Sequence, residues 1–115
     1  MKATRRSIIK KLDKLFSEKI RSVGFCQHCG KKSGLQCAHI FSRKNYSIRW
    51  DEENAVCLCL RCHLYWAHKE PVEFTKWVTE FKNIPYLENK INNPISIKTF
   101  ELEELLNNYK NERNL

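Results

Sequence analysis

The sequence predicts a small α+β domain in which helices flank a short β-hairpin. Apolar residues recur at helical spacing before residue 24 and again after Pro71. Between these segments, residues 25–63 show little helical periodicity and hold all six cysteines. Because 115 residues suffice for one compact domain, we expect 1–115 to form a single domain: a basic helix (1–24), a cysteine-rich core (25–70) and C-terminal helices (71–115).

The first segment is expected to form an amphipathic helix that ends at Gly24. Basic residues separate its apolar positions, which are Ile8, Ile9, Leu12, Leu15, Phe16 and Ile20. Thr4 or Ser7 can cap its start, and glycine suits the left-handed residue that follows a helix. The basic face of this helix is as compatible with a solvated surface as with a DNA-contacting one.

The middle segment is expected to form strands and turns before a second helix begins. Residues 36–41 and 55–60 have the composition of two strands, which the polar loop 42–54 would join into a hairpin. A helix should follow from about Arg61 and must end near Pro71, because proline cannot continue a helix.

The C-terminal part is expected to contain two core-packing helices. Phe74, Trp77, Val78 and Phe81 recur at i, i+3, i+4 and i+7, which is one face of a helix. Residues 84–94 are rich in turn-forming residues and are expected to form turns. Thr99 is expected to cap a last helix that runs through Tyr109, contributes Leu105 and Leu106 to the core, and has glutamates near its N-terminus.

Positive charge is concentrated in the first half of the chain. The net charge is +8 and the pI is about 9.3. Residues 1–50 carry 13 Lys and Arg against two acids, whereas residues 51–115 carry eight against 11. An anionic partner is therefore expected on the first half. Nucleic acid is the commonest such partner, because phosphate neutralisation releases counterions.

The sequence predicts a cytoplasmic protein without a membrane partner. Lys and Arg interrupt the first 16 residues, so no apolar secretory segment is seen there. The longest apolar run, residues 55–60, is far shorter than the roughly 20 residues that span a bilayer. Cytoplasmic thiols stay reduced, so the six cysteines favour metal binding or packing over disulfides.

Two Cys-x-x-Cys pairs predict a structural zinc site. Each pair can place two thiolates on one tetrahedral ion, and the four ligands would be Cys26, Cys29, Cys59 and Cys62. Four sulfurs fill the coordination sphere, so this ion would stabilise the fold instead of taking part in catalysis. Cys37 and Cys57 belong to neither pair and are expected to be packing residues.

The two Cys-x-x-Cys pairs and the residues around them resemble the zinc-stapled branch of the HNH (ββα-metal) endonuclease family. His39, Asn54 and His63 fall on the three signature positions, with His63 directly after the last cysteine. The resemblance covers about residues 26–68. Residues 37–43 and 49–51 look most like phage-encoded HNH proteins, including the NinG/Rap type linked to recombination. The resemblance implies a DNA endonuclease with a ββα-metal core, in a bacterial or phage-infected host cell.

The chemistry of phosphodiester hydrolysis agrees with this resemblance. The reaction needs an activated water and a cation that absorbs charge in the transition state. His39 is the expected general base, because a backbone carbonyl at the end of its strand could hold one ring nitrogen and leave the other free. The resemblance makes His63 a ligand of the catalytic Mg²⁺ or Mn²⁺ and gives Asn54 the task of bonding loop backbone.

Ala38 departs from the family pattern. The family commonly has Asp or His before the catalytic histidine, where it supplies a second metal ligand, and alanine has no ligand atom. His68 is the best substitute, although a spacing of five residues matches the α-helical repeat poorly. Asp51 and Cys37 are weaker candidates. If none substitutes, metal binding would be weak or activity lost.

Charged loop residues are candidates for holding DNA. Arg43, Lys44 and Arg49 lie in the loop beside His39 and could clamp the scissile phosphate or its neighbours. The main alternative function is a zinc-dependent DNA-binding module without catalysis, in which Ala38 marks a dead metal site. A single active site per chain predicts nicking, so cutting both strands would require a homodimer.

Overall fold

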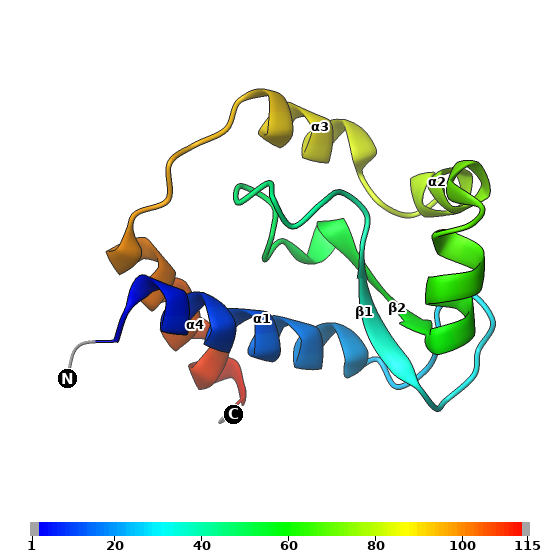
Figure 1. Cartoon of the computed structure of the whole chain (residues 1–115), viewed down its shortest axis with the longest axis horizontal. Coiled ribbons are helices and arrows are strands. Elements are labelled where there is room, and N and C mark those ends of the chain that lie inside the picture. Colours follow the sequence, from blue (N-terminus) through cyan, green and yellow to red (C-terminus); the bar gives the residue numbers. More distant parts are fainter. Residues whose placement is uncertain (1–2, 114–115) are drawn as a thin grey trace.

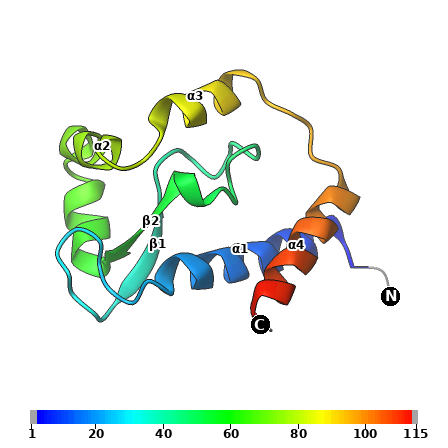
Figure 2. The ribbon, with the colours of Figure 1, turned by 180° about the vertical axis from the view of Figure 1, so that it is seen from behind.

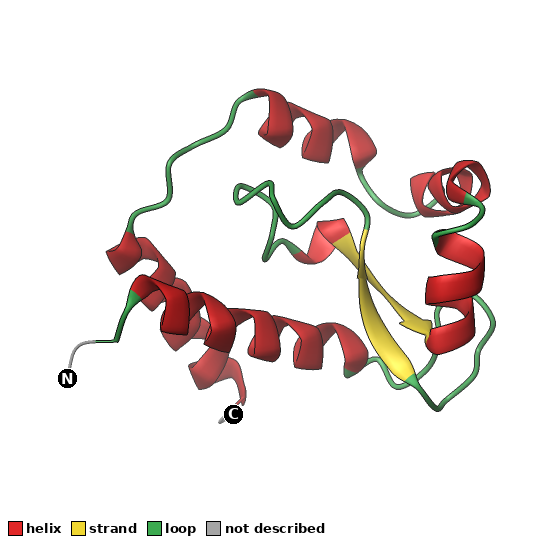
Figure 3. Ribbon diagram, viewed as in Figure 1, coloured by secondary structure: helices red, strands yellow, loops and turns green. Residues whose placement is uncertain are grey.

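A two-stranded hairpin lies between two groups of helices in the computed structural model, which describes residues 3–113 (Figures 1 and 3). Strand β1 (Leu35–His39) pairs antiparallel with β2 (Ala55–Cys59). Cys37 lies opposite Cys57 and His39 opposite Ala55. The predicted α+β class is therefore confirmed, and so is the hairpin with its long connecting loop.

Helices α1 (Arg5–Arg21) and α4 (Thr99–Arg113) form the first group and pack side by side (Figures 1 and 2). Thr4 caps α1, since its Oγ1 accepts a hydrogen bond from the Ser7 N–H at 3.1 Å. The helix ends three residues before Gly24, which has the expected left-handed backbone at φ +87°. The buried side chains between α1, α4 and the hairpin are Ile8, Leu12, Phe16, Trp50, Ala55, Leu102, Leu106 and Tyr109.

The second group comprises η2 (Cys62–Ala67), α2 (Pro71–Thr79) and α3 (Ile84–Asn92) (Figure 1). Its core includes Val56 and Leu58 of β2, with Phe74, Val78, Ile84 and Leu87 from α2 and α3. Trp77 is half-buried against this core. Among residues 3–113, no helix combines the length and the apolar character that crossing a membrane requires.

The expectation of turns over 84–94 is wrong, because α3 occupies most of this stretch. Asn83 Oδ1 caps the helix by accepting from the Tyr86 N–H at 3.1 Å, and a proline stands in its first turn. Asn and Pro are among the turn-forming residues of this stretch, but both are also favoured at the start of a helix. The prediction that Phe81 packs in the core is also wrong. Helix α2 ends at Thr79, and the Phe81 side chain is 45% exposed.

The helix after β2 differs in kind from the expected α-helix. Element η2 is a π-helix, whose hydrogen bonds join residues five apart. The His68 N–H donates to the His63 carbonyl at 3.3 Å, which is such a bond. Residues five apart therefore lie next to each other here. The expectation that a five-residue spacing separates His63 from His68 is therefore wrong for this segment.

One buried side chain closes the loop between the strands. Asn54 has no exposed surface and makes three side-chain hydrogen bonds. Its Oδ1 accepts from the Phe41 N–H at 2.8 Å, and its Nδ2 donates to the carbonyls of Phe41 and Ile48. Its own carbonyl accepts from the Ile40 N–H. Both ends of the loop are thereby tied to one residue.

We predict that Asn54→Ala lowers the free energy of unfolding by about 3 kcal/mol, because three buried backbone groups lose their partner. Urea unfolding in excess zinc measures the change. The exposed Asn107 of α4 provides the control, and Asn107→Ala should change stability by less than about 0.5 kcal/mol. Equal effects of the two substitutions would show that the loop does not depend on Asn54.

Candidate functional site

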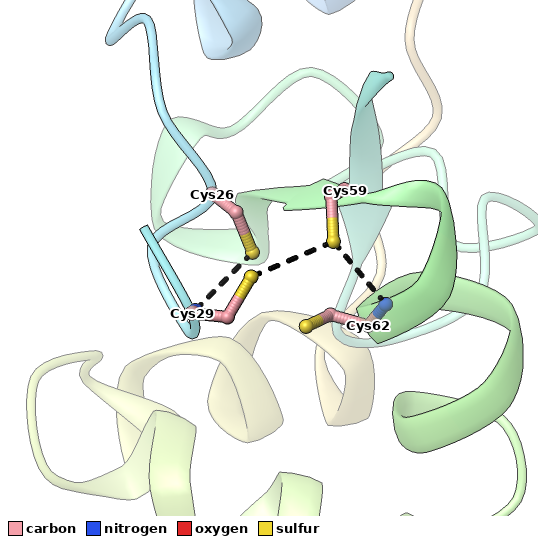
Figure 4. A group of neighbouring side chains, drawn as sticks. All are labelled: Cys26, Cys29, Cys59 and Cys62. Atoms are coloured by element: carbon pink, nitrogen blue, oxygen red, sulfur yellow. Dashed lines mark hydrogen bonds between the residues drawn. The ribbon is translucent and has the colours of Figure 1, made fainter. Parts of the chain in front are cut away.

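The four cysteines of the two Cys-x-x-Cys pairs converge at one end of the hairpin (Figure 4). Their sulfur atoms all lie within 4.8 Å of one another, and the Cys29 and Cys59 sulfurs are 3.7 Å apart. A tetrahedral ion with Zn–S bonds of 2.3 Å separates its sulfurs by about 3.8 Å. Cys26, Cys29, Cys59 and Cys62 can therefore hold a metal ion, and their geometry fits zinc.

The backbone shapes both pairs in the same way. The N–H of Cys29 points to the Cys26 sulfur at 3.4 Å, and that of Cys62 to the Cys59 sulfur at 3.5 Å. Gly30 follows the first pair with φ +85°, which favours glycine. Gln27 attaches this pair to β2: it exchanges two 2.8 Å hydrogen bonds with Cys57, using its N–H and its side-chain oxygen.

Electrostatics favours a thiolate at the first pair. Burial of the Cys26 thiol raises its pKa, but backbone N–H groups, led by that of Cys29, outweigh burial and lower the pKa to about 6. Burial and the neighbouring cysteines raise the pKa of Cys62. A metal ion would remove this conflict, because it binds all four sulfurs as thiolates.

The other two cysteines lie outside the cluster. Cys57 is buried in β2, as expected of a packing residue. Cys37 is half-buried and lines a cleft that also has residues of α1 in its walls. Burial raises the pKa of Cys37 to about 12, so it is a neutral thiol.

That cleft contains four of the predicted site residues. It measures about 380 Å³, and α1, β1, the following loop and the region of η2 contribute its walls. His39, His63, His68 and Arg43 line it, together with Asp13, Phe16, Ser17, Cys37 and Ser42. Asn54 lies beneath the loop and supports it. The structure therefore brings together the three histidines that the sequence singled out.

His39 is held by one ring nitrogen, as expected of a general base. Its Nε2 donates to the Arg49 carbonyl at 3.0 Å. A carbonyl oxygen only accepts, so Nε2 carries the proton and the neutral ring has its lone pair on Nδ1. Burial lowers the pKa of His39 more than the Arg49 carbonyl raises it. The side chain is therefore a neutral base at pH 7.

His63 is held through its other ring nitrogen, Nδ1. Its Nδ1 donates to the Gln36 side-chain oxygen at 2.7 Å, so its lone pair lies on Nε2. Burial, followed by the nearby His68 and His39, lowers the pKa of His63. A neutral imidazole anchored through its other nitrogen is the usual state of a metal-binding histidine.

The π-helix places His68 beside His63. Their ring centroids are 4.8 Å apart and the rings are nearly perpendicular. His68 is exposed, whereas Ala38 is buried with its methyl group in the hairpin core. Within residues 3–113, the four-cysteine cluster is the only group of three or more His, Cys, Asp or Glu ligand atoms close enough to hold an ion. The histidine pair would thus need ligands from water or substrate.

The three charged loop residues have different environments. Arg43 is 58% exposed and lines the cleft. Lys44 is exposed but is not among the cleft residues. Arg49 is not among the cleft residues either, because its guanidinium binds Asp13 of α1 through two hydrogen bonds of 3.0 and 2.6 Å. Its side chain serves the fold, while its carbonyl holds His39.

Sequence reasoning missed two supporting residues, Asp13 and Gln36. Asp13 accepts hydrogen bonds from Arg49 and from the Trp50 indole N–H at 3.0 Å. As one of only two acids in the basic half, Asp13 could have been recognised. Gln36 carries no such signal, because its role depends on strand pairing that turns it towards His63.

His28 contacts two residues of the η2 segment, Trp66 and Cys62. Its ring stacks on Trp66 with centroids 3.6 Å apart, and its Nδ1 lies 3.4 Å from the Cys62 sulfur. The residue is exposed, and it borders the cysteine cluster. Trp66 itself packs against the core of the second helical group.

Comparisons with protein-family models, curated proteins and solved structures gave no match to this chain. A function for the protein therefore rests on the chemistry of the cysteine cluster and of the histidine cleft.

We predict that the protein binds one zinc ion through the cysteine cluster. Cys59→Ala should abolish stoichiometric zinc, measured by elemental analysis, and the cobalt–thiolate absorption of the Co²⁺-substituted protein. Cys57→Ala is the matched control, since both residues are buried in β2 but only Cys59 belongs to the cluster. A zinc-free wild-type protein, or loss of zinc in both variants, would contradict the assignment.

Proposed function

We propose that this protein is a metal-dependent DNA endonuclease that hydrolyses phosphodiester bonds. The observation that carries the proposal is the pair of histidines anchored in one cleft. His39 keeps a lone pair on Nδ1 and His63 keeps one on Nε2, because each uses its other nitrogen to donate to a fixed acceptor. One base and one metal ligand are the elements that this hydrolysis requires.

His39 would act as the general base. A neutral imidazole at pH 7 can take a proton from a water molecule that attacks phosphorus. The Arg49 carbonyl would stabilise the imidazolium that forms, since it already accepts the Nε2 proton. Arg43, exposed at the same cleft, would hold a phosphate oxygen. Asn54 would act indirectly by fixing the loop.

His63, with His68, would hold Mg²⁺ or Mn²⁺. Such an ion would supply stabilisation of negative charge on the phosphate and on the departing oxygen. Two imidazoles fit an ion that retains several waters and takes phosphate oxygens from DNA. Because Ala38 cannot contribute, the π-helical placement of His68 is what supports a second protein ligand.

The cysteine cluster would have a structural task in this protein. In the proposal, Zn²⁺ joins the turn before β1 to the end of β2, and so fixes the position of η2, which begins at Cys62. His63 follows that ligand directly. A zinc-stapled HNH core, as the sequence resemblance implies, would place the metal-binding histidine in this way.

The resemblance to phage proteins of the NinG/Rap type supports DNA processing or recombination in a bacterial or phage-infected cytoplasm as the setting. A non-catalytic, zinc-dependent DNA-binding module is the second candidate. The buried Ala38 and the histidine pair without a third protein ligand in the described chain favour it. The two functions can be distinguished experimentally, because only the endonuclease needs His39 as a base and an added divalent metal ion.

We predict that the zinc-loaded protein nicks supercoiled plasmid when Mg²⁺ or Mn²⁺ is added. His39→Ala should reduce the nicking rate by about 10²- to 10⁴-fold, because the general base is lost. Gel analysis of the relaxed plasmid measures the rate. Zinc content and circular dichroism provide the control for folding of the variant.

Free imidazole gives a further control, because it can enter the space left by His39→Gly and restore part of the rate. If wild-type and His39→Ala proteins shift the plasmid equally on a gel and neither nicks it, the binding-module function is correct. Equal nicking by both proteins would exclude His39 as the base.

A further inference from the structure

The two sides of α1 differ in how their basic residues are paired. Lys19, on the side towards α4, has its charge offset by Glu112 at 2.6 Å and Glu52 at 3.2 Å. Lys10, Lys14 and Arg21 are exposed, and none of these three forms an ion pair within residues 3–113. An uncompensated row of cations therefore follows one side of the helix.

This row lies along the histidine cleft. Residues three, four and seven apart share a helix face, so Lys10, Lys14 and Arg21 lie on the face that carries Asp13 and Ser17. Both of those residues line the cleft. Arg21 donates to the Ser17 hydroxyl at 3.1 Å, which ties the C-terminal end of the row to the cleft wall.

We propose that Lys10, Lys14 and Arg21 form a binding track for the backbone of duplex DNA beside the cleft. The inference rests on the proposed function, because it takes DNA as the partner. Eleven residues of α-helix separate the ends of the row by about 16 Å. That is the rise of about five base pairs of B-DNA, so the row can follow one phosphate strand towards Arg43.

The cleft itself favours a duplex over a single strand. Binding of single strands relies on exposed aromatic rings that stack on bases. The only aromatic carbon ring among the cleft residues is that of Phe16, which is 1% exposed. Apart from Phe16 and Cys37, the residues that line the cleft have charged or polar side chains, and these suit contacts to phosphates and sugars.

The test measures DNA binding separately from cutting. In the full chain carrying His39→Ala, fluorescence anisotropy gives the affinity for a labelled duplex over a range of NaCl concentrations. Adding Lys10→Gln, Lys14→Gln and Arg21→Gln should weaken binding about tenfold or more and make the salt slope shallower by about 3. The control carries Lys76→Gln, Lys98→Gln and Lys110→Gln, which remove the same charge from exposed positions elsewhere.

The control should keep the salt slope of the His39→Ala parent. Equal losses in the two triple variants, or no binding of the duplex by the parent, would overturn the track. A single strand of the same length that binds as tightly, with the same dependence on the row, would overturn the choice of duplex. Plasmid nicking by proteins with His39 intact tests the proposed function separately, so the track can fail while the nuclease stands, or the reverse.

Discussion

The site depends on the amide of Asn54, which holds the loop between the two strands. By bonding to Phe41 and Ile48, this buried side chain ties together two points far apart in the loop. His39 lies two residues before the first point, and Arg49 directly follows the second. The hydrogen bond from His39 Nε2 to the Arg49 carbonyl is therefore a consequence of the loop closure. A single amide thus sets the tautomer of the proposed base.

The supports of the site come from different parts of the fold. Asp13 of α1 fixes the Arg49 side chain, so the carbonyl that holds His39 is attached to the first helical group. Gln36 of β1 orients His63, which belongs to the second group. The hairpin joins these groups, and the cleft opens where they meet. The same arrangement leaves the unpaired basic side of α1 along the cleft, where it would guide an anionic substrate to the proposed site.

Patterns that depend on local spacing were predictable from the sequence, whereas those that depend on pairing were not. The hairpin, the main helices and the four-cysteine cluster follow from apolar periodicity and Cys-x-x-Cys spacing, and the structure confirms them. Helix α3 was missed because Asn83 and Pro85 serve turns and helix starts alike. The segment after β2 was expected to follow α-helical periodicity, so its π-helix was not predicted. The proximity of His63 to His68 could not be predicted for the same reason. The ion pair of Arg49 with Asp13 joins residues 36 apart, a distance beyond any local pattern.

The most direct test of the account is nitrogen-15 NMR of the chain's four histidines, before and after adding Mn²⁺ to the zinc-loaded protein. We expect a neutral Nε2–H tautomer for His39 and a neutral Nδ1–H tautomer for His63 at pH 7. Mn²⁺ should broaden the signals of His39, His63 and His68 while the His28 signal, beside the cysteine cluster, stays sharp. Reversed tautomers, or equal broadening of all four rings, would contradict a catalytic metal site in the cleft.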